Sequence, residues 1–292
     1  MAQVAAVIIG MASALMVLAN GQLGDALNPY RGSVLIHVIG LLVQAVIMFV
    51  RKTETRLRRG LPLWCYFGGS LGVITVTFSM YAFRRLGVAP VVALNLLGMT
   101  VSSVLVDQFG WLGMPRYPLT TAKLVSLAVI TAGVLVLLMP LDLTAGIAIL
   151  LALLTGASAV LSRTLNARVL VFYNVHMSTL FNYVTGLLTS FLLLVSLAGP
   201  TVFAPFALSP NWLMYTGGAV GAVMVSLTSY VVVHMSAFNV TVLMFLGQYF
   251  FGMLLDALSG RLPSLQAFAG GLMVLAGLLI TYAERRGKAS PG

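Results

Sequence analysis

Residues 66–81 read YFGGSLGVITVTFSMY, and residues 215–230 read YTGGAVGAVMVSLTSY. At a constant offset of 149, a tyrosine opens and closes both stretches and three glycines fall in register. Leucine and valine match by chance in any apolar sequence, whereas tyrosine and glycine seldom do so at a single register. The two stretches therefore indicate an internal repeat, and this repeat decides the architecture of the chain.

The repeat extends in both directions from these stretches. Residues 66–107 align with residues 215–256, and an offset of 146 aligns residues 14–44 with residues 160–190. Polar residues fall in register in both alignments: Asn20 with Asn166, and Asp107 with Asp256. We therefore predict two related halves, residues 1–142 and residues 143–292.

The composition places the chain in a membrane. Of its 292 residues, 60% are hydrophobic and 8% are charged, and the mean hydropathy is +1.04. A soluble domain carries about a quarter charged residues, so this chain cannot cover a globule in water. A soluble enzyme, a nucleic-acid-binding module and a disordered chain are thereby excluded. Cys65 is the one cysteine, so no intrachain disulfide can form.

Apolar runs of the length needed to cross a bilayer, about 20 residues, recur along the chain. We predict an all-α membrane protein with ten transmembrane helices, five in each half. The predicted spans are 4–24, 32–50, 63–82, 88–107, 122–139, 143–162, 175–197, 212–234, 238–256 and 265–283.

The basic residues predict the orientation. Twelve Lys and Arg residues fall on one side of the predicted spans and four on the other: Arg31, Arg84, Arg85 and Arg261. Because cytoplasmic loops are enriched in Lys and Arg, both termini are expected in the cytoplasm of a multi-pass inner (plasma) membrane protein. Arg163 and Arg168 are counted among the cytoplasmic loop charges.

An odd number of spans in each half predicts that the second half is inverted. The loop at 51–62 carries five basic residues, while its counterpart at 199–211 carries no charge. One loop is thus expected inside and the other outside. Inverted repeats are typical of secondary transporters, whose substrate site lies near the middle of the membrane between the halves.

Polar side chains inside the spans are the candidate substrate-binding residues, because polar groups that face lipid are costly. They are His37, Gln44, Thr75, Thr77, Asn95, Tyr183, Gln248, Asn20 and Asn166. The alternative is that these groups hold helices together by hydrogen bonds, as polar residues in spans often do. Both interpretations stay open for His37 and for the Ser and Thr positions.

Four tyrosines lie near span ends, with Tyr81 and Tyr215 outward and Tyr66 and Tyr230 inward. They form either a gate at each mouth or part of an aromatic belt at the interfaces. Asp107 and Asp256 close spans 4 and 9 at opposite faces. We expect them to cap or pair near the interface, with proton coupling as the alternative.

Signatures of catalysis are missing from the sequence. It holds no metal-spaced His/Cys/Asp cluster, no phosphate-binding glycine loop and no G-x-S-x-G motif. We therefore expect a protein that is not an enzyme and that needs no cofactor and no metal.

Several runs resemble a known family. They are Asn20-Gly21-Gln22-Leu23-Gly24, Gly68-Gly69-Ser70-Leu71-Gly72, Arg85-Leu86-Gly87-Val88-Ala89, Leu105-Val106-Asp107-Gln108-Phe109-Gly110, Gly113-Met114-Pro115 and Ala132-Gly133-Val134. They are similar to the YdcZ-like inner-membrane exporters of the drug/metabolite transporter superfamily, and the chain looks like two such units fused. The family pattern has Gly-Gln within the fourth span, which Gly247-Gln248 keeps and Gly98-Met99 does not. An asymmetric site is therefore expected.

The sequence predicts a secondary transporter that works by alternating access, and the resemblance favours export. The expected partners are the lipid bilayer and a small neutral, zwitterionic or amphiphilic metabolite or drug, with no nucleic acid. A monomer and a homodimer are equally compatible with the sequence. Two other functions stay open: a membrane scaffold subunit that transports nothing, and a flippase for lipids or lipid-linked head groups.

Overall fold

The computed structural model describes residues 2–56, 60–86, 88–137, 145–197, 199, 210–258 and 265–289. Within these residues the chain forms ten α-helices, three short 3₁₀ turns and no strand. The helices are α1 (Ala2–Leu27), α2 (Pro29–Val50), α3 (Gly68–Leu86), α4 (Val88–Phe109), α5 (Thr121–Leu137), α6 (Gly146–Phe172), α7 (Val175–Leu197), α8 (Thr216–His234), α9 (Ala237–Leu258) and α10 (Leu265–Ala289). The 3₁₀ turns are η1 (Leu63–Phe67), η2 (Trp111–Gly113) and η5 (Trp212–Tyr215).

Eight of these helices are long and apolar enough to cross a membrane. The apolar segments of the remaining two, α5 and α10, are shorter: Thr121–Val136 and Phe268–Gly277. Each predicted span overlaps one of these helices. The all-helical membrane class predicted from composition is therefore confirmed.

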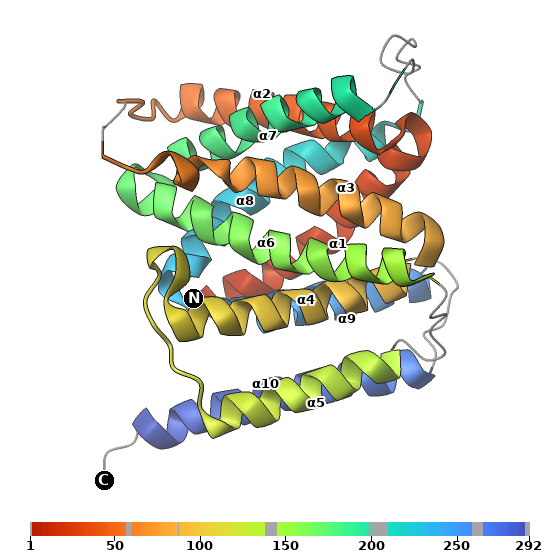
Figure 1. Cartoon of the computed structure of the whole chain (residues 1–292), viewed down its shortest axis with the longest axis vertical. Helices are drawn as coiled ribbons and strands as arrows, with labels where there is room; N and C mark the ends of the chain where they lie inside the picture. The colour runs from red at the N-terminus through yellow and green to blue at the C-terminus, as the bar shows by residue number, and fades with distance from the viewer. Residues whose placement is uncertain are drawn as a thin grey trace.

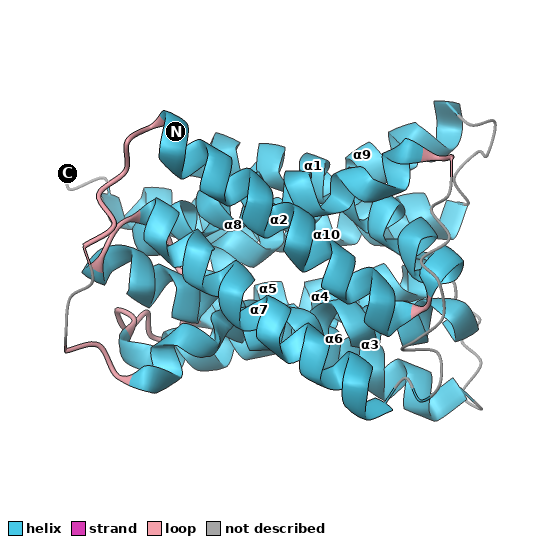
Figure 2. Ribbon diagram, turned by 90° about the horizontal axis from the view of Figure 1, so that it is seen from above, coloured by secondary structure: helices cyan, strands magenta, loops and turns pink. Residues whose placement is uncertain are grey.

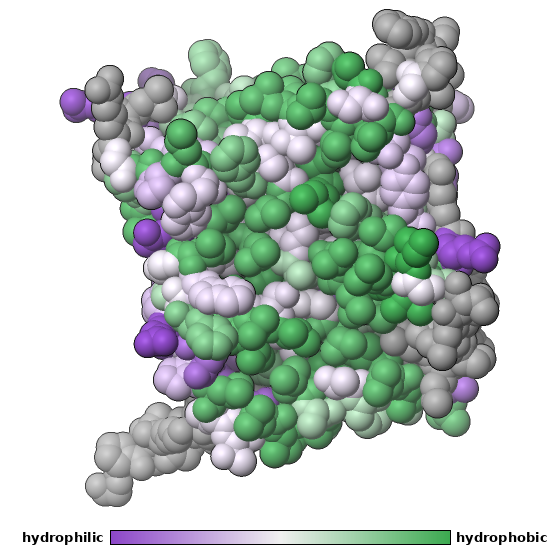
Figure 3. All heavy atoms as spheres, viewed as in Figure 1, coloured by the Kyte–Doolittle hydropathy of each residue, from purple (hydrophilic) through white to green (hydrophobic). Residues whose placement is uncertain are grey.

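Successive helices cross the molecule in alternating directions, and the connecting loops gather at its two ends (Figures 1 and 2). The first turn of α1 and the last turn of α10 lie at the same end. Hydrophobic side chains cover the face between the two ends, while strongly hydrophilic residues lie toward the ends (Figure 3). Phe49 is 85% exposed and Ile147 is 79% exposed, as expected for side chains that contact lipid.

Two asparagines that the sequence alignment places in register lie at the starts of α2 and α7. The side chain of Asn28 accepts hydrogen bonds from the backbone N–H groups of Tyr30 and Arg31, at 3.1 and 3.0 Å. Its φ of 77° is in the left-handed region, which asparagine tolerates better than most residues. Asn174 accepts a hydrogen bond of 2.9 Å from the N–H of Met177. These caps explain why each turn is so short.

Helices α1 to α5 pack mainly against helices α6 to α10. α1 packs on α8 and α9, α6 packs on α3 and α4, and α2 packs on α7. α5 and α10 pack chiefly against each other and form a separate layer beside the other eight helices (Figure 1). The largest buried apolar cluster, around Phe238 and Leu96, joins α4 and α9 to α5, α6 and α10.

Some predicted loop charges lie inside helices. The predicted span 143–162 is too short, because α6 continues to Phe172 and contains Arg163 and Arg168. Arg163 is 6% exposed, so it is a buried charge, and counting it among the loop charges was wrong. Arg31 is also buried, in the first turn of α2. Arg58, Arg59, Arg261 and most of the 199–211 loop lie outside the described residues.

Candidate functional site

The interface between α2 and α7 carries a chain of buried polar groups around His37. Nδ1 of His37 lies 2.8 Å from the carbonyl oxygen of Ser33, which can only accept, so Nδ1 carries the proton. Nδ1 also lies 3.1 Å from the hydroxyl of Ser190, and that hydroxyl donates to the carbonyl of Gly186 at 2.7 Å. The two serine hydroxyls of the chain are 3.0 Å apart. His37 is thus held in one orientation by both helices.

Tyr183 stands beside His37, with ring centroids 5.8 Å apart. Its hydroxyl faces the carbonyl of Gly218 on α8 at 3.4 Å. The ring lies directly against Gly40, where a Cβ would come within 2.0 Å of it. The structure therefore brings together His37 and Tyr183, two of the predicted site residues, at the centre of the α2–α7 contact.

Asn20 and Asn166 occupy matching positions but have different partners. Oδ1 of Asn166 lies against Gly68 of α3, and Oδ1 of Asn20 lies against Gly217 of α8. Asn166 also donates from Nδ2 to Oδ1 of Asn182 at 2.9 Å. Oδ1 of Asn20 is buried without a hydrogen-bond partner. Asn166 is therefore part of the helix packing, whereas Asn20 keeps a free acceptor.

Other predicted residues share this property of an unpaired buried atom. Oδ1 of Asn95, Oγ1 of Thr77 and Oε1 of Gln44 have no hydrogen-bond partner. A buried polar atom left unpaired costs about 1–3 kcal/mol, so such atoms are uncommon and call for an explanation. They are also the atoms best able to pair with a polar substrate.

The remaining candidates are placed less specifically. Nε2 of Gln44 donates to the carbonyl of His176 at 3.0 Å and so ties α2 to the first turn of α7. The hydroxyl of Thr75 donates to the carbonyl of Leu71 within its own helix. Gln248 is half-buried on α9.

The four predicted gating tyrosines have unlike surroundings. The hydroxyl of Tyr66 forms a hydrogen bond of 2.9 Å with the hydroxyl of Tyr173. The ring centroids of Tyr66 and Phe181 are 4.7 Å apart. At the other end of α3, Tyr81 donates to the hydroxyl of Tyr30 at 2.8 Å. One tyrosine pair thus joins η1 to the end of α6 and the other joins α3 to the start of α2, and neither partner was foreseen.

Tyr215 and Tyr230 lie among other groups. Tyr215 packs at the edge of an apolar cluster that contains Leu23 and Met214. Tyr230 is 51% exposed and lies against the ring of His234, with centroids 4.3 Å apart.

Asp107 caps a helix. Its Oδ1 accepts the N–H of Ala237 at 2.9 Å and its Oδ2 accepts the N–H of Phe238 at 3.2 Å, at the start of α9. A carboxylate at a helix N-terminus is stabilised by the helix dipole. The side chain of Asp256 is outside the part of the chain that the structure describes.

Sequence reasoning missed a buried cluster next to Asp107. Nη2 of Arg163 donates to Ser103 Oγ at 3.1 Å, to the carbonyl of Ala237 at 3.3 Å and to Oγ1 of Thr241. The cluster joins α4, α6 and α9. The signal that could have found it is the apolar run after Arg163, since Val169, Leu170, Val171 and Phe172 show that the helix continues.

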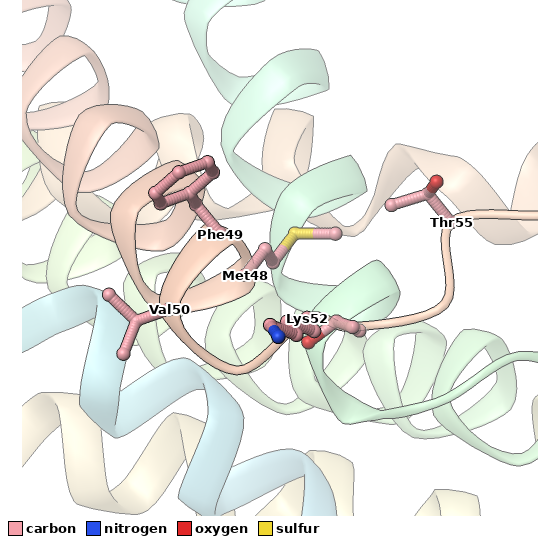
Figure 4. Close-up of a pocket in the computed structure, with 6 residues that line it drawn as sticks. Met48, Phe49, Val50, Lys52 and Thr55 are labelled. Atoms are coloured by element: carbon pink, nitrogen blue, oxygen red, sulfur yellow. The ribbon is translucent and has the colours of Figure 1, made fainter.

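A cavity of about 540 Å³ opens at the end of α2, away from these groups. It is lined by Met48, Phe49, Val50, Lys52, Thr53 and Thr55 (Figure 4). None of the predicted substrate-binding residues lines it. Among the described residues, no three His, Cys, Asp or Glu side chains are grouped so that they could hold a metal ion.

Comparison with known proteins identifies relatives. The family model described as "Putative inner membrane exporter, YdcZ" matches the chain in two segments, residues 1–136 and 147–280. A solved structure described as "Crystal structure of protein" is 19% identical, with a TM-score of 0.70 over 99% of this chain and 98% of that chain. At this identity the likeness concerns the fold alone. No curated protein matches the chain.

Proposed function

Because the chain belongs to the YdcZ family of inner-membrane exporters, we propose that it is a secondary transporter that moves a small metabolite or drug by alternating access. Membership makes it a multi-pass inner-membrane protein and confirms the resemblance seen in the sequence. In our proposal the halves are residues 1–142 and 143–292, all ten helices span the membrane, and both termini are cytoplasmic.

Reciprocal contacts between the halves are the observation that carries this proposal. Gly10 of α1 lies against the carbonyl of Met244 of α9, and a Cβ there would be 1.9 Å from that oxygen. Gly156 of α6 lies against the carbonyl of Asn95 of α4, and a Cβ at position 156 would be 2.1 Å from that oxygen. The two contacts correspond under the repeat, because the offset of 146 pairs position 10 with position 156 and the offset of 149 pairs position 95 with position 244.

The same exchange relates three further pairs of contacts. They are Gly98 on Leu153 with Gly247 on Val7, Gly40 on Tyr183 with Gly186 on His37, and Gly69 on Asn182 with Gly218 on Ile36. A chance resemblance between halves has no reason to conserve contacts across an interface. An axis of pseudo-twofold symmetry in the membrane plane explains them, because helices five positions apart run in opposite directions.

Alternating access follows from this symmetry. Each half can take either of two equivalent poses, so that exchanging the poses moves the opening from one face to the other. The pairs Tyr66–Tyr173 and Tyr30–Tyr81 act as the gates of the two mouths. Between them, the unpaired amide oxygens of Asn20 and Asn95 and the half-buried Gln248 contact the substrate.

Uptake into proteoliposomes tests the function. The purified protein, reconstituted with known orientation, is assayed against a panel of radiolabelled metabolites, with and without a pH gradient. Counterflow of at least one compound above empty liposomes is expected. An absence of flux for every compound, in vesicles whose orientation is verified, would favour a scaffold subunit.

A further inference from the structure

The buried guanidinium of Arg163 is unusual in lacking a full set of partners. Its side chain is 6% exposed, yet Nε and Nη1 have no hydrogen-bond partner. The structure gives no direct ion pair between Arg163 and Asp107, and both oxygens of Asp107 accept backbone N–H groups of α9. Asp107 still attracts Arg163 electrostatically at longer range, but the two donors of Arg163 stay without hydrogen bonds, and a buried polar group left unpaired costs about 1–3 kcal/mol, more when it is charged.

Helix packing does not require this charge. Under the proposed repeat, the residues that correspond to Arg163, Ser103 and Thr241 are Val17, Gly252 and Val92. α1 packs against α9 with Val17 at the equivalent position, as α6 packs against α4 with Arg163. The cation is therefore an addition to one half, which agrees with a site that is asymmetric.

Arg163 lies on the same seam between α4 and α6 as Asn95. Gly156 of α6 contacts Asn95, and seven residues later Arg163 contacts Ser103 of α4. Residues seven apart lie on one face of a helix. Asn95 and Ser103 are eight residues apart, or about 12 Å along the helix axis. Arg163 and Asn95 are thus about two helical turns apart on one interface between α4 and α6.

We propose that Arg163 is the anion-recognising residue of the transport site and that the substrate carries a carboxylate. The inference rests on the proposed function and narrows its substrate to an organic acid or an amino-acid-like zwitterion. Arg163 and Lys123 both interact electrostatically with Asp107, so these three groups leave one net positive charge, which a monoanion matches and a phosphate dianion would exceed. A guanidinium also presents paired N–H donors that fit a carboxylate.

Matched pairs of carboxylic acids and their primary amides test this inference. Binding to the full-length protein in nanodiscs is followed by the fluorescence of its three tryptophans, and flux is followed in proteoliposomes. The unmodified protein is expected to prefer an acid over its amide by roughly 10- to 100-fold. Equal binding of acid and amide, or binding of chloride and nitrate in place of any acid, would overturn the inference.

Variants assign the preference to one side chain. Arg163→Gln is expected to lose the preference, so that it binds an acid and the matching amide about equally. Arg168→Gln is the matched control on the same helix, because Arg168 donates to the carbonyl of Gly113 and not to the cluster. An Arg163→Gln protein that folds and still prefers acids to the same degree would refute the assignment.

A charge-retaining variant covers the case in which Arg163→Gln does not fold. Arg163→Lys is expected to keep the preference for acids at reduced affinity, because lysine retains the charge without the planar fork. Unaltered affinity for both acid and amide in Arg163→Lys would count against the inference. In the unmodified protein, flux of neutral solutes as fast as the flux of the matching acids would contradict the carboxylate alone and leave the transporter proposal in place.

Discussion

The imidazole of His37 on α2 occupies the space that a side chain at Gly186 on α7 would need. A Cβ at position 186 would lie 2.4 Å from Nε2 of His37. The corresponding contact is equally tight, because a Cβ at position 40 would lie 2.0 Å from a ring carbon of Tyr183. The two helices can thus approach each other only because each carries a glycine opposite the other's ring.

Gly186→Ala and Gly40→Ala are therefore expected to destabilise the protein by about 1–3 kcal/mol, as overpacking of a tight contact does. The control is Gly21→Ala, because a Cβ at Gly21 meets no atom within 4 Å. Alanine there is expected to be neutral or to stabilise α1 by up to about 1 kcal/mol. Thermal unfolding in detergent measures the stability of all three variants. Equal melting temperatures for the three variants would contradict the packing.

Asn95→Leu is expected to separate stability from transport. Because Oδ1 of Asn95 has no partner, leucine removes an unpaired polar group and leaves the melting temperature unchanged or higher. Flux is expected to fall about tenfold or more, the loss of one substrate hydrogen bond to an amide. The measurement pairs counterflow with thermal unfolding.

Asn166→Leu is the control for that variant. It removes the donor to Oδ1 of Asn182, so it is expected to lower the free energy of unfolding by about 1–3 kcal/mol. A fall in flux in Asn95→Leu that is fully explained by loss of folded protein would argue against substrate contact.

Tyr66→Phe tests whether the tyrosine pairs are gates or belt residues. Loss of the bond to Tyr173 is expected to weaken closure of that mouth by about 1 kcal/mol, or roughly fivefold in the population of the open form. Inside labelling of a cysteine at position 95 should rise by that factor. Tyr230→Phe is the control, since Tyr230 contacts His234 through its ring. Equal labelling in both variants would favour an aromatic belt.

Single cysteines test the proposed orientation, on a background in which the buried Cys65 is replaced by alanine. Thr55 and Asn211 are both exposed in the structure. Thr55→Cys is expected to react with an impermeant maleimide only from the cytoplasmic side, and Asn211→Cys only from outside. Reaction of both from one side would contradict an inverted second half.

Much of the fold could be predicted because hydropathy and the repeat act over long stretches. Twenty-residue apolar runs leave a helix as the only way to satisfy the backbone in lipid. The alignment of Gly68 with Gly217 pointed to equivalent packing positions, and both glycines in fact lie against an asparagine. These inferences needed only residue type and spacing.

The partners of polar side chains could not be predicted, because they come from helices distant in sequence. Nothing in α2 indicates that His37 bonds Ser190 of α7, or that Tyr66 bonds Tyr173. Arg163 was misread for a related reason: a charge lowers local hydropathy, so the predicted span ended at residue 162. Ser103 and Thr241, which allow that charge to be buried, lie on α4 and α9.

The most direct test of alternating access is the two-sided labelling of one buried residue. Asn95→Cys, in the cysteine-free background, is exposed to an impermeant thiol reagent in right-side-out and in inside-out vesicles. Thr55→Cys and Asn211→Cys report the orientation of each preparation. The account predicts that the cysteine at position 95 reacts from both sides, at rates that change in opposite directions when Tyr66 is replaced by phenylalanine. Reaction from neither side, or from one side only, would contradict it.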